Sequence, residues 1–309
     1  MSDELIPKLT AEDVERLIPG AKVVGSPKNG GQKLFYPITI NNQRYGSKFL
    51  LVNPACIRSE DEQVQMDIQE AIMARATREY ETMKSCQSPY LVASGPVPLR
   101  TEKIGEDIIL FFTEEFIQGK DIGELIKLGR CKDIAKGKQL AENIGKAIDI
   151  LYSCNKIHRD IKPQNIMFNE STSNFVLLDM GLVFDFDDKS ITRFGFVPGT
   201  CVYYSPEHTN FEKRREMDFR SDLFCLGIVL YEYLTGIHPF VTRRGSTTEE
   251  IVENIVNHVQ EPAISVNPSI PEAFSLLIDR LLQKKPHLRY RKVSHFLEDV
   301  EKLELEANI

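Results

Sequence analysis

Alternating apolar and polar positions mark the first third of the chain as rich in β-strands. Residues 21–52 carry short runs of β-branched and aromatic side chains, separated by turn-forming clusters at 26–31 and 41–42. Two later runs have the same character. The predicted strands are 22–24, 33–40, 45–52, 91–97 and 108–116.

A long helix is predicted over residues 61–84, because apolar side chains recur there every three or four positions. Glu79 falls on this apolar stripe, since it lies three residues after Ala76 and four before Met83. A carboxylate on an inward face needs a cation, because an unpaired buried charge is very costly. We therefore expect a basic partner for Glu79. The apolar members of the stripe are Val64, Ile68, Ile72, Ala76 and Met83.

Beyond a break at 118–121 the pattern becomes mainly helical, except that the short apolar runs 166–168 and 175–178 predict a small hairpin. A β-rich first third and a helical remainder imply two lobes with a cleft between them, where cofactor sites tend to lie. The predicted helices include the stripe Leu140, Ile144, Ile148 and Leu151, and the segments 222–234, 249–259 and 271–282. The expected boundaries are an extension over 1–19 with a helix after Thr10, lobes over 20–116 and 117–300, and a tail over 301–309.

Composition is that of an ordinary soluble globular protein, with 27% charged residues among 309 and a net charge of −7. The acidic balance argues against general binding to nucleic acids or anionic membranes. Six scattered cysteines without a C-x-x-C pair indicate free thiols in a reducing compartment. The acidic start at 1–4 is followed by no long apolar run, and the apolar run 223–234 is too short to span a bilayer. We expect a cytoplasmic protein.

The strongest candidate chemistry lies in residues 158–165, His-Arg-Asp-Ile-Lys-Pro-Gln-Asn. Asp160 is suited to accept a hydroxyl proton, Lys162 to balance charge on a moving phosphoryl group, and Asn165 to hold a metal ion. In phosphoryl transfer these three side chains must meet around one reacting group, and their close spacing in the sequence is consistent with that.

This segment resembles the H-R-D-x-K-P-x-N catalytic loop of the eukaryotic-like serine/threonine protein kinases, and further motifs extend the resemblance over about residues 20–300. It implies an α+β, bilobal protein kinase fold with a β-rich N-lobe and a mainly helical C-lobe. It also implies ATP and Mg²⁺ as cofactors, and a protein carrying Ser or Thr as the substrate. The further motifs are Asp179-Met180-Gly181, the run 199–207, the run 220–227 and the run 285–289.

The resemblance assigns roles to side chains in both predicted lobes. Asp179 would hold Mg²⁺ together with Asn165, since hard oxygen ligands suit that ion. Lys48 resembles the strand lysine that holds the α and β phosphates, and Glu79, ten residues before Pro89, would be its partner. Glu81 is the alternative partner, although it lies off the apolar face. The long gap from Lys48 to Glu79 implies an insertion near 53–65.

The nucleotide-binding motifs depart most from the family pattern. Gly30 aligns with the second glycine of the G-x-G-x-x-G-x-V loop, Gly31 follows it, and Lys33 stands where the third glycine is expected. Flexible backbone at 30–31 would still let N–H groups approach phosphates. Glu115, Phe116 and Ile117 resemble the hinge that binds adenine, and Asp121 is placed to reach the ribose.

The residue at the back of the adenine pocket would be Glu114, or Thr113 if the register slips by one. A charged residue there departs from the family pattern.

The run 199–207 resembles the platform for a peptide substrate, which kinases of small molecules generally lack. Glu207 should pair with Arg289. Asp222 would anchor the catalytic loop, or act as a helix N-cap, and the two roles can coexist. The resemblance implies an activation segment over 182–205. A phosphate on this segment would bind Arg159 and so order the segment. The candidate phosphorylation sites are Thr192, then Ser190, and Thr200.

The sequence therefore predicts an ATP-dependent serine/threonine protein kinase. A pseudokinase scaffold, which binds nucleotide or partners without turnover, is the alternative that Met180 and the irregular glycine loop favour. A small-molecule phosphotransferase is a third reading, and the peptide platform argues against it. The protein substrate, the pathway, the organism and the oligomeric state are left open.

Overall fold

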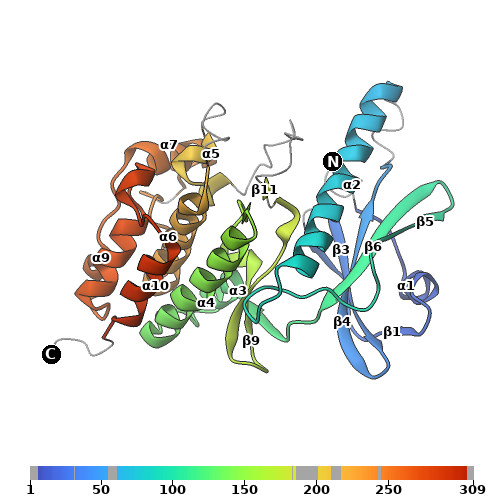
Figure 1. The fold of residues 1–309 in the computed structure, drawn as a ribbon, viewed down its shortest axis with the longest axis horizontal. Coiled ribbons are helices and arrows are strands. Elements are labelled where there is room, and N and C mark those ends of the chain that lie inside the picture. Colours follow the sequence, from blue (N-terminus) through green and yellow to red (C-terminus); the bar gives the residue numbers. More distant parts are fainter. Residues whose placement is uncertain are drawn as a thin grey trace. The chain divides into compact units, whose positions relative to one another are not determined.

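A computed structural model describes residues 6–30, 32–54, 61–182, 184–185, 201–209, 217–242 and 245–304. Its chain divides into two compact units (Figure 1). One unit, here called the sheet unit, comprises residues 1–87 and 92–117, and the other, the helical unit, comprises 88–91 and 118–309.

The sheet unit is built on an antiparallel sheet in the order β1-β3-β4-β6-β5, with β2 paired to β3. Its register sets Lys48 of β4 between Phe35 of β3 and Phe112 of β6. Alternation along β4 therefore turns Lys48 and Gly46 to one face of the sheet. The strands are β1 (Ala21–Val23), β2 (Lys28–Gly30), β3 (Lys33–Ile40), β4 (Gln43–Leu51), β5 (Arg100–Ile104) and β6 (Asp107–Glu115).

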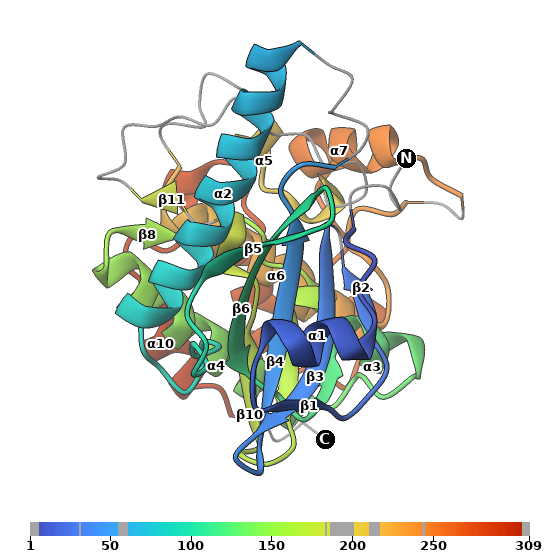
Figure 2. The ribbon, with the colours of Figure 1, turned by 90° about the vertical axis from the view of Figure 1, so that its right-hand side faces the viewer.

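Helix α1 (Ala11–Leu17) follows Thr10, as predicted, and lies across one face of the sheet (Figure 2). Thr10 and Asp13 form a capping box that satisfies the first N–H groups of the helix. Val14 and Ile18 are buried in the same apolar cluster as strand residues such as Phe49. The helix inside the expected N-terminal extension is thus packed into the core of the sheet unit.

Helix α2 (Glu62–Ser85) confirms the long predicted helix and begins after the N-cap Asp61. Its apolar stripe is buried only in the second half, where Ala76, Glu79 and Met83 are at most 1% exposed, whereas Val64 is 41% exposed. The first turns of the helix extend past the ends of the strands (Figures 1 and 2). Sequence periodicity predicted the inward face correctly but not how far the sheet reaches along it.

The predicted strand at 91–97 is wrong. That segment makes only isolated bridges, from Leu91 to Leu177 and from Ser94 to Glu114. Pro96 interrupts it and Pro98 follows it directly, and proline has no N–H to donate to a regular ladder. The segment still follows β6 irregularly, because Gly95 N donates to Thr113 O at 2.8 Å.

Helices α4 (Ile134–Ser153) and α6 (Phe219–Thr235) form the centre of the helical unit. Nearly every side chain of α6 is buried, which explains its apolar run as a core helix. Every helix within the described residues is too short or too polar to span a bilayer. The predicted helices near 249–259 and 271–282 are confirmed. The remaining helices are α3 (Ile122–Lys127), α5 (Pro206–Thr209), α7 (Thr248–Asn257), α8 (Ala263–Val266), α9 (Glu272–Leu281) and α10 (Val293–Glu301).

The predicted hairpin is confirmed as β9 (Ile166–Asn169) and β10 (Asn174–Leu177), and β7 (Gly119–Asp121) adds a third strand to it. Ile166 pairs with Leu177, so β9 begins directly after Asn165 and β10 ends two residues before Asp179. The bond from Leu178 N to Asn165 O, at 2.8 Å, closes this end of the hairpin. The hairpin thereby brings the backbones that carry Asn165 and Asp179 together. The other short elements of the helical unit are β8 (Lys156–Ile157), β11 (Phe184–Asp185), and the 3₁₀ turns Pro163–Asn165, Met180–Leu182, Cys201–Tyr203 and Pro286–Leu288.

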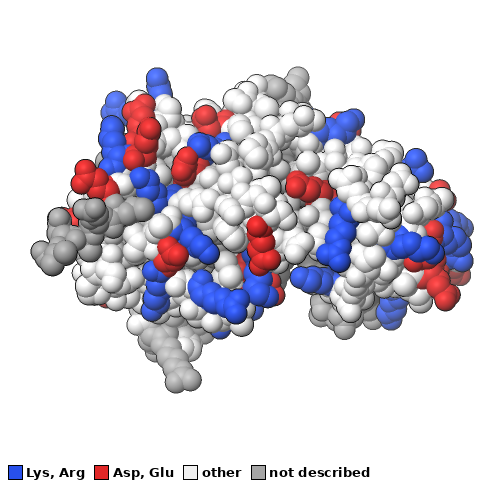
Figure 3. All heavy atoms as spheres, turned by 90° about the horizontal axis from the view of Figure 1, so that it is seen from below, with Lys and Arg blue, Asp and Glu red and all other residues white. Residues whose placement is uncertain are grey.

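Charged side chains of both signs are scattered over the face seen in Figure 3, where Lys and Arg are interspersed with Asp and Glu. Such mixing is typical of a solvated protein surface.

Candidate active site

Asp160 is the centre of a buried hydrogen-bonded group in the loop between β8 and β9. Lys162 Nζ lies 2.8 Å from Asp160 Oδ2, and Asn165 Nδ2 donates to the same oxygen at 2.9 Å. Asn165 Nδ2 also donates to the backbone oxygen of Asp160 at 2.8 Å. The other carboxylate oxygen, Oδ1, is buried and accepts no hydrogen bond within the described residues. One oxygen is thus fixed by two donors, while the other keeps its capacity to accept a proton.

Asp222 of α6 holds this loop through backbone bonds. Its two carboxylate oxygens accept from His158 N at 2.7 Å and from Arg159 N at 2.8 Å. Burial raises the pKa of Asp222, and His158 and Arg159 oppose that rise. The N-cap of α6 is Asp218, whose side chain accepts from Arg220 N, so Asp222 anchors the loop without being the cap.

Two oxygen-bearing side chains in the helical unit suit a divalent cation. Asn165 uses its amide nitrogen for both bonds to Asp160, so the oxygen of its side chain takes no part in them. Asp179 adopts a left-handed backbone conformation with φ +58, and Gly181 N donates to its Oδ1 at 3.3 Å. A carboxylate and an amide oxygen are the ligand types that Mg²⁺ prefers. The buried side chain of Met180 lies directly after Asp179.

The sheet unit contains a chain of four buried charges, which we call the charge chain: Lys33, Glu79, Lys48 and Glu114. Glu79 Oε1 lies 2.7 Å from Lys48 Nζ, and Glu79 Oε2 lies 2.5 Å from Lys33 Nζ. Lys48 Nζ also lies 2.8 Å from Glu114 Oε2. All four residues are at most 8% exposed. Of the two predicted alternatives, Glu79 is therefore the one that contacts Lys48, whereas Glu81 is exposed to solvent.

Sequence reasoning missed two members of the charge chain. In the family alignment Lys33 stands at a glycine of the phosphate loop, and the charge of Glu114 suggests a register slip to Thr113. Strand alternation supplies the signal, because Gly46 pairs with Glu114 and shares a face with Lys48. Thr113 points to the other face, where its hydroxyl accepts from Val97 N at 2.8 Å. Of the two alternatives, Glu114 is the residue beside Lys48.

Glu114 carries the clearest electrostatic perturbation in the charge chain. Burial raises the pKa of its carboxyl group, while the neighbouring Lys48 lowers it and Glu79 raises it further. The charged form of Glu114 thus depends on the cation beside it.

The remaining predicted nucleotide contacts have simpler surroundings. Gly30 ends β2 with open space around it, and Gly31 lies outside the described residues. In the hinge segment Glu115 is exposed and Ile117 is 6% exposed. Asp121 accepts from Glu124 N at 2.8 Å and so caps α3.

In the helical unit Glu207 and Arg289 form a buried pair with two contacts. Arg289 Nη1 lies 2.7 Å from Glu207 Oε1, and Nη2 lies 3.1 Å from Oε2. Arg289 is 1% exposed. The candidate phosphorylation sites Ser190, Thr192 and Thr200 lie outside the described residues.

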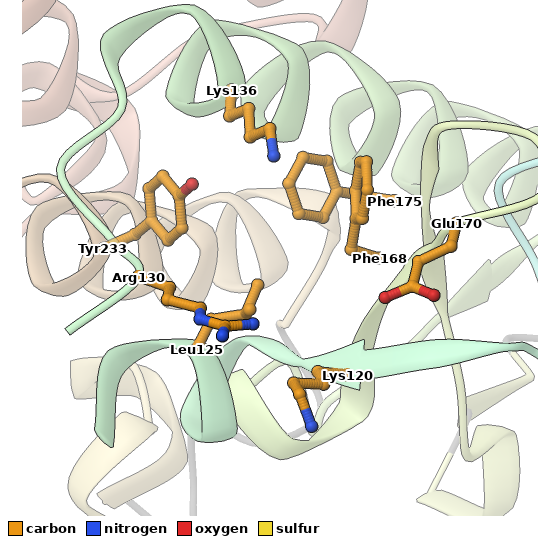
Figure 4. A pocket seen from close by; sticks show the side chains of 8 residues that line it. All are labelled: Lys120, Leu125, Arg130, Lys136, Phe168, Glu170, Phe175 and Tyr233. Atoms are coloured by element: carbon orange, nitrogen blue, oxygen red, sulfur yellow. The ribbon is translucent and has the colours of Figure 1, made fainter. Parts of the chain in front are cut away.

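A separate cavity of about 160 Å³ lies in the helical unit (Figure 4). Lys136 Nζ stands 4.8 Å from the centre of the Phe168 ring on its wall. None of the predicted site residues lines this cavity, so the cavity is not the predicted active site. The lining residues are Lys120, Leu125, Arg130, Lys136, Phe168, Glu170, Phe175 and Tyr233.

The sequence of this chain is similar to those of known proteins. A family model described as protein kinase domain matches residues 55–299. A probable serine/threonine-protein kinase of Clostridium perfringens is 31% identical over 66% of this chain and 29% of its own length. The probable serine/threonine-protein kinase PknB of Bifidobacterium longum is 29% identical over 74% of this chain and 33% of its own. The serine/threonine-protein kinase PknH of Mycobacterium tuberculosis is 28% identical over 70% of this chain and 32% of its own length.

The chain thus spans about a third of the length of these curated relatives. The family-model match begins after Lys48 and includes the catalytic loop, Asp179, Glu207 and Arg289. The expected α+β fold, with a β-rich N-lobe and a helical C-lobe, is confirmed. This chain belongs to the eukaryotic-like serine/threonine protein kinase family.

Proposed function

We propose that this chain is an ATP-dependent protein kinase that transfers the γ-phosphoryl group to Ser or Thr hydroxyls of proteins. The observation that carries the proposal is the state of Asp160. One of its carboxylate oxygens is held by Lys162 and Asn165, and the other is buried and accepts no hydrogen bond from any described residue.

The reaction follows from these positions. The substrate hydroxyl loses its proton to Asp160 as its oxygen forms a bond to the γ-phosphorus. The bond between that phosphorus and the β–γ bridging oxygen breaks, and ADP leaves. Lys162, already beside Asp160, offsets the charge on the transferring group. Lys48 would hold the α and β phosphates, and Glu79 would hold Lys48.

Mg²⁺ would be held by Asn165 and Asp179, and when bound it neutralises charge on the phosphates. The hinge residues Glu115 and Ile117 are proposed to bind adenine through their backbone, with Gly30 and Gly31 near the phosphates and Asp121 near the ribose. Autophosphorylation of the activation segment, with Thr192 preferred to Ser190, is part of the same proposal.

Asp160→Asn tests the function with little change in volume. Phosphoryl transfer from γ-labelled ATP to a mixed protein extract should fall by a factor of at least about 10². Asp149→Asn is the matched control, because Asp149 is exposed on α4. Undiminished transfer by Asp160→Asn would rule out the assigned role of Asp160.

A nucleotide-binding scaffold without turnover is the second candidate function. The observation that favours it is the carboxylate of Glu114, which lies 2.8 Å from the lysine expected to hold phosphates. Binding of Mg-ATP by the wild-type chain, together with no transfer to any protein, would support the scaffold over the kinase.

A further inference from the structure

The cavity of Figure 4 lies inside the helical unit and is lined from several of its elements. Strand β7, the helices α3, α4 and α6, and the β9–β10 hairpin each contribute at least one lining side chain. Because these elements pack against one another, the shape of the cavity is set by the fold of this one unit.

A buried hydroxyl group faces the cavity. Tyr233 of α6 is 0% exposed, and its hydroxyl oxygen has no hydrogen-bond partner within the described residues. In Figure 4 this hydroxyl points into the space that the lining side chains surround. Burial, and then the nearby Asp133, raise the pKa of Tyr233, so the hydroxyl keeps its proton and remains a donor. An acceptor inside the cavity would satisfy this donor, and a negatively charged acceptor would do so most strongly.

Basic side chains surround the same space. Lys136 points its ammonium group into the cavity, 4.8 Å from the centre of the Phe168 ring. Lys136 and Arg130 are exposed, and neither forms an ion pair with a carboxylate of the described residues. Among the described lining residues, Lys120 is a third cation and Glu170 is the one carboxylate. This excess of positive charge favours an anion over water or a neutral molecule as the occupant.

The rest of the lining is apolar and encloses a limited volume. The rings of Phe168 and Phe175 have their centres 5.0 Å apart, and Leu125 adds an aliphatic side chain to the wall. A cavity of roughly 150 Å³ holds one benzene ring. The volume of this cavity is about 160 Å³, so it suits a ligand with a single ring.

We propose that this cavity binds a small aromatic carboxylate, with one carboxylate oxygen accepting from the Tyr233 hydroxyl and the other facing Lys136 and Arg130. The ring of the ligand packs against Phe168 and Leu125. This site goes beyond the proposed kinase activity and does not depend on it, because no residue assigned to phosphoryl transfer lines the cavity.

A ligand-detected NMR titration of the full chain with benzoate tests the site. Benzamide is the matched ligand, because it keeps the ring and the shape of benzoate but carries no charge. For a ligand of this size the Kd of benzoate should be about 1 mM or lower. Benzamide should bind at least about ten-fold more weakly, because it lacks the charge that the cations and the hydroxyl recognise.

Three variants locate the binding in this cavity. Tyr233→Phe removes only the hydroxyl and should raise the Kd of benzoate by about ten-fold. Lys136→Met should raise it by about three-fold, because an exposed cation contributes less. Glu170→Gln should instead lower the Kd by about two-fold, because it removes a carboxylate that repels the ligand.

Two matched controls and a stability measurement accompany these variants. Tyr231→Phe and Lys127→Met should leave the Kd unchanged, since Tyr231 is buried on α6 and Lys127 is exposed on α3, but neither lines the cavity. Without ligand, the midpoint of urea unfolding of Tyr233→Phe should equal or exceed that of wild type, because the deleted hydroxyl has no partner to lose.

Three results would each overturn the proposal. The first is no binding of benzoate up to about 10 mM. The second is binding that Tyr233→Phe and Lys136→Met leave unchanged, which would place the ligand elsewhere. The third is a lower midpoint of unfolding for Tyr233→Phe, which would show that the hydroxyl already has a partner. None of these measurements uses ATP, so their outcome is separate from that of the kinase assays.

Discussion

Two buried ion-pair sites among the described residues, one in each unit, are built differently. Arg289 in the helical unit is saturated: it contacts both oxygens of Glu207 and donates to the backbone oxygens of Arg220, Gln283 and Lys284. The charge chain in the sheet unit instead joins four side chains end to end. A planar guanidinium with fixed donors suits a permanent anchor, whereas lysine ammonium groups on flexible stems suit a site that must accept a phosphate.

The two sites also differ in how closely they follow the family motifs. Glu207 and Arg289 stand at the positions that the motifs predict, whereas Lys33 and Glu114 depart from the motifs. This contrast predicts that damage to the two sites will appear in different measurements.

Breaking the anchor should have the largest effect on stability. Arg289→Met would leave Glu207 buried without its cation, and the free energy of unfolding should fall by about 3–5 kcal/mol. Urea unfolding of the variant measures this loss. Arg291→Met, which alters an exposed arginine two residues later, should change stability by no more than about 0.5 kcal/mol. A loss below about 1 kcal/mol for Arg289→Met would contradict its role as the anchor.

Breaking the charge chain at Lys48 should affect activity more than folding. Lys48→Met should reduce phosphoryl transfer by about 10²-fold or more, because it removes the proposed phosphate contact. Its stability cost should be only about 1–3 kcal/mol, since Lys33 stays beside Glu79 and Glu114 can take up a proton. Initial rates with labelled ATP and urea unfolding give the two values. Lys103→Met, on the exposed face of β5, is the control that should change neither.

Asp222 links the anchored part of the helical unit to the catalytic loop. Asp222→Asn keeps its volume but replaces one acceptor by an amide nitrogen, which cannot accept from His158 N or Arg159 N. We expect kcat to fall by about ten-fold with a smaller change in KM, because the loop loses alignment rather than substrate contacts. An unchanged kcat would show that the two backbone bonds do not position Asp160.

The smallest effect concerns the pH dependence of stability. Burial raises the pKa of Glu114 in the folded protein, so at a pH between the unfolded and the folded pKa the folded state holds a proton that the unfolded state has released. Stability from this group is therefore present below the unfolded value of about 4.5 and is lost as pH rises toward the folded pKa. The stability of wild type relative to Glu114→Gln should fall over that window. A difference that rises with pH, or stays constant, would contradict the direction assigned to Glu114.

Much of the fold follows from local patterns, because long helices and the 166–178 hairpin repeat their apolar positions at regular intervals. The apolar stripe also identified Glu79 as an inward carboxylate that needs a cation. The failures have specific causes. Proline interrupts the expected strand at 91–97, and the first turns of α2 reach beyond the sheet that would bury them.

The charge chain shows what a single sequence conceals. Lys33 and Glu114 each departed from a motif, but only the pairing of β3, β4 and β6 reveals that they contact the same pair. Register between distant strands is a tertiary property that residue spacing does not encode. The roles of the individual site residues remain predictions that the variants above test.

The most direct test is phosphosite mapping of a mixed protein extract incubated with this chain, Mg²⁺ and ATP carrying heavy oxygen on its γ-phosphoryl group. New heavy phosphate on serine and threonine residues, absent when Asp160→Asn replaces the wild-type chain, is the predicted result. No heavy phosphate on any protein with the wild-type chain, or equal amounts with both chains, would contradict the account.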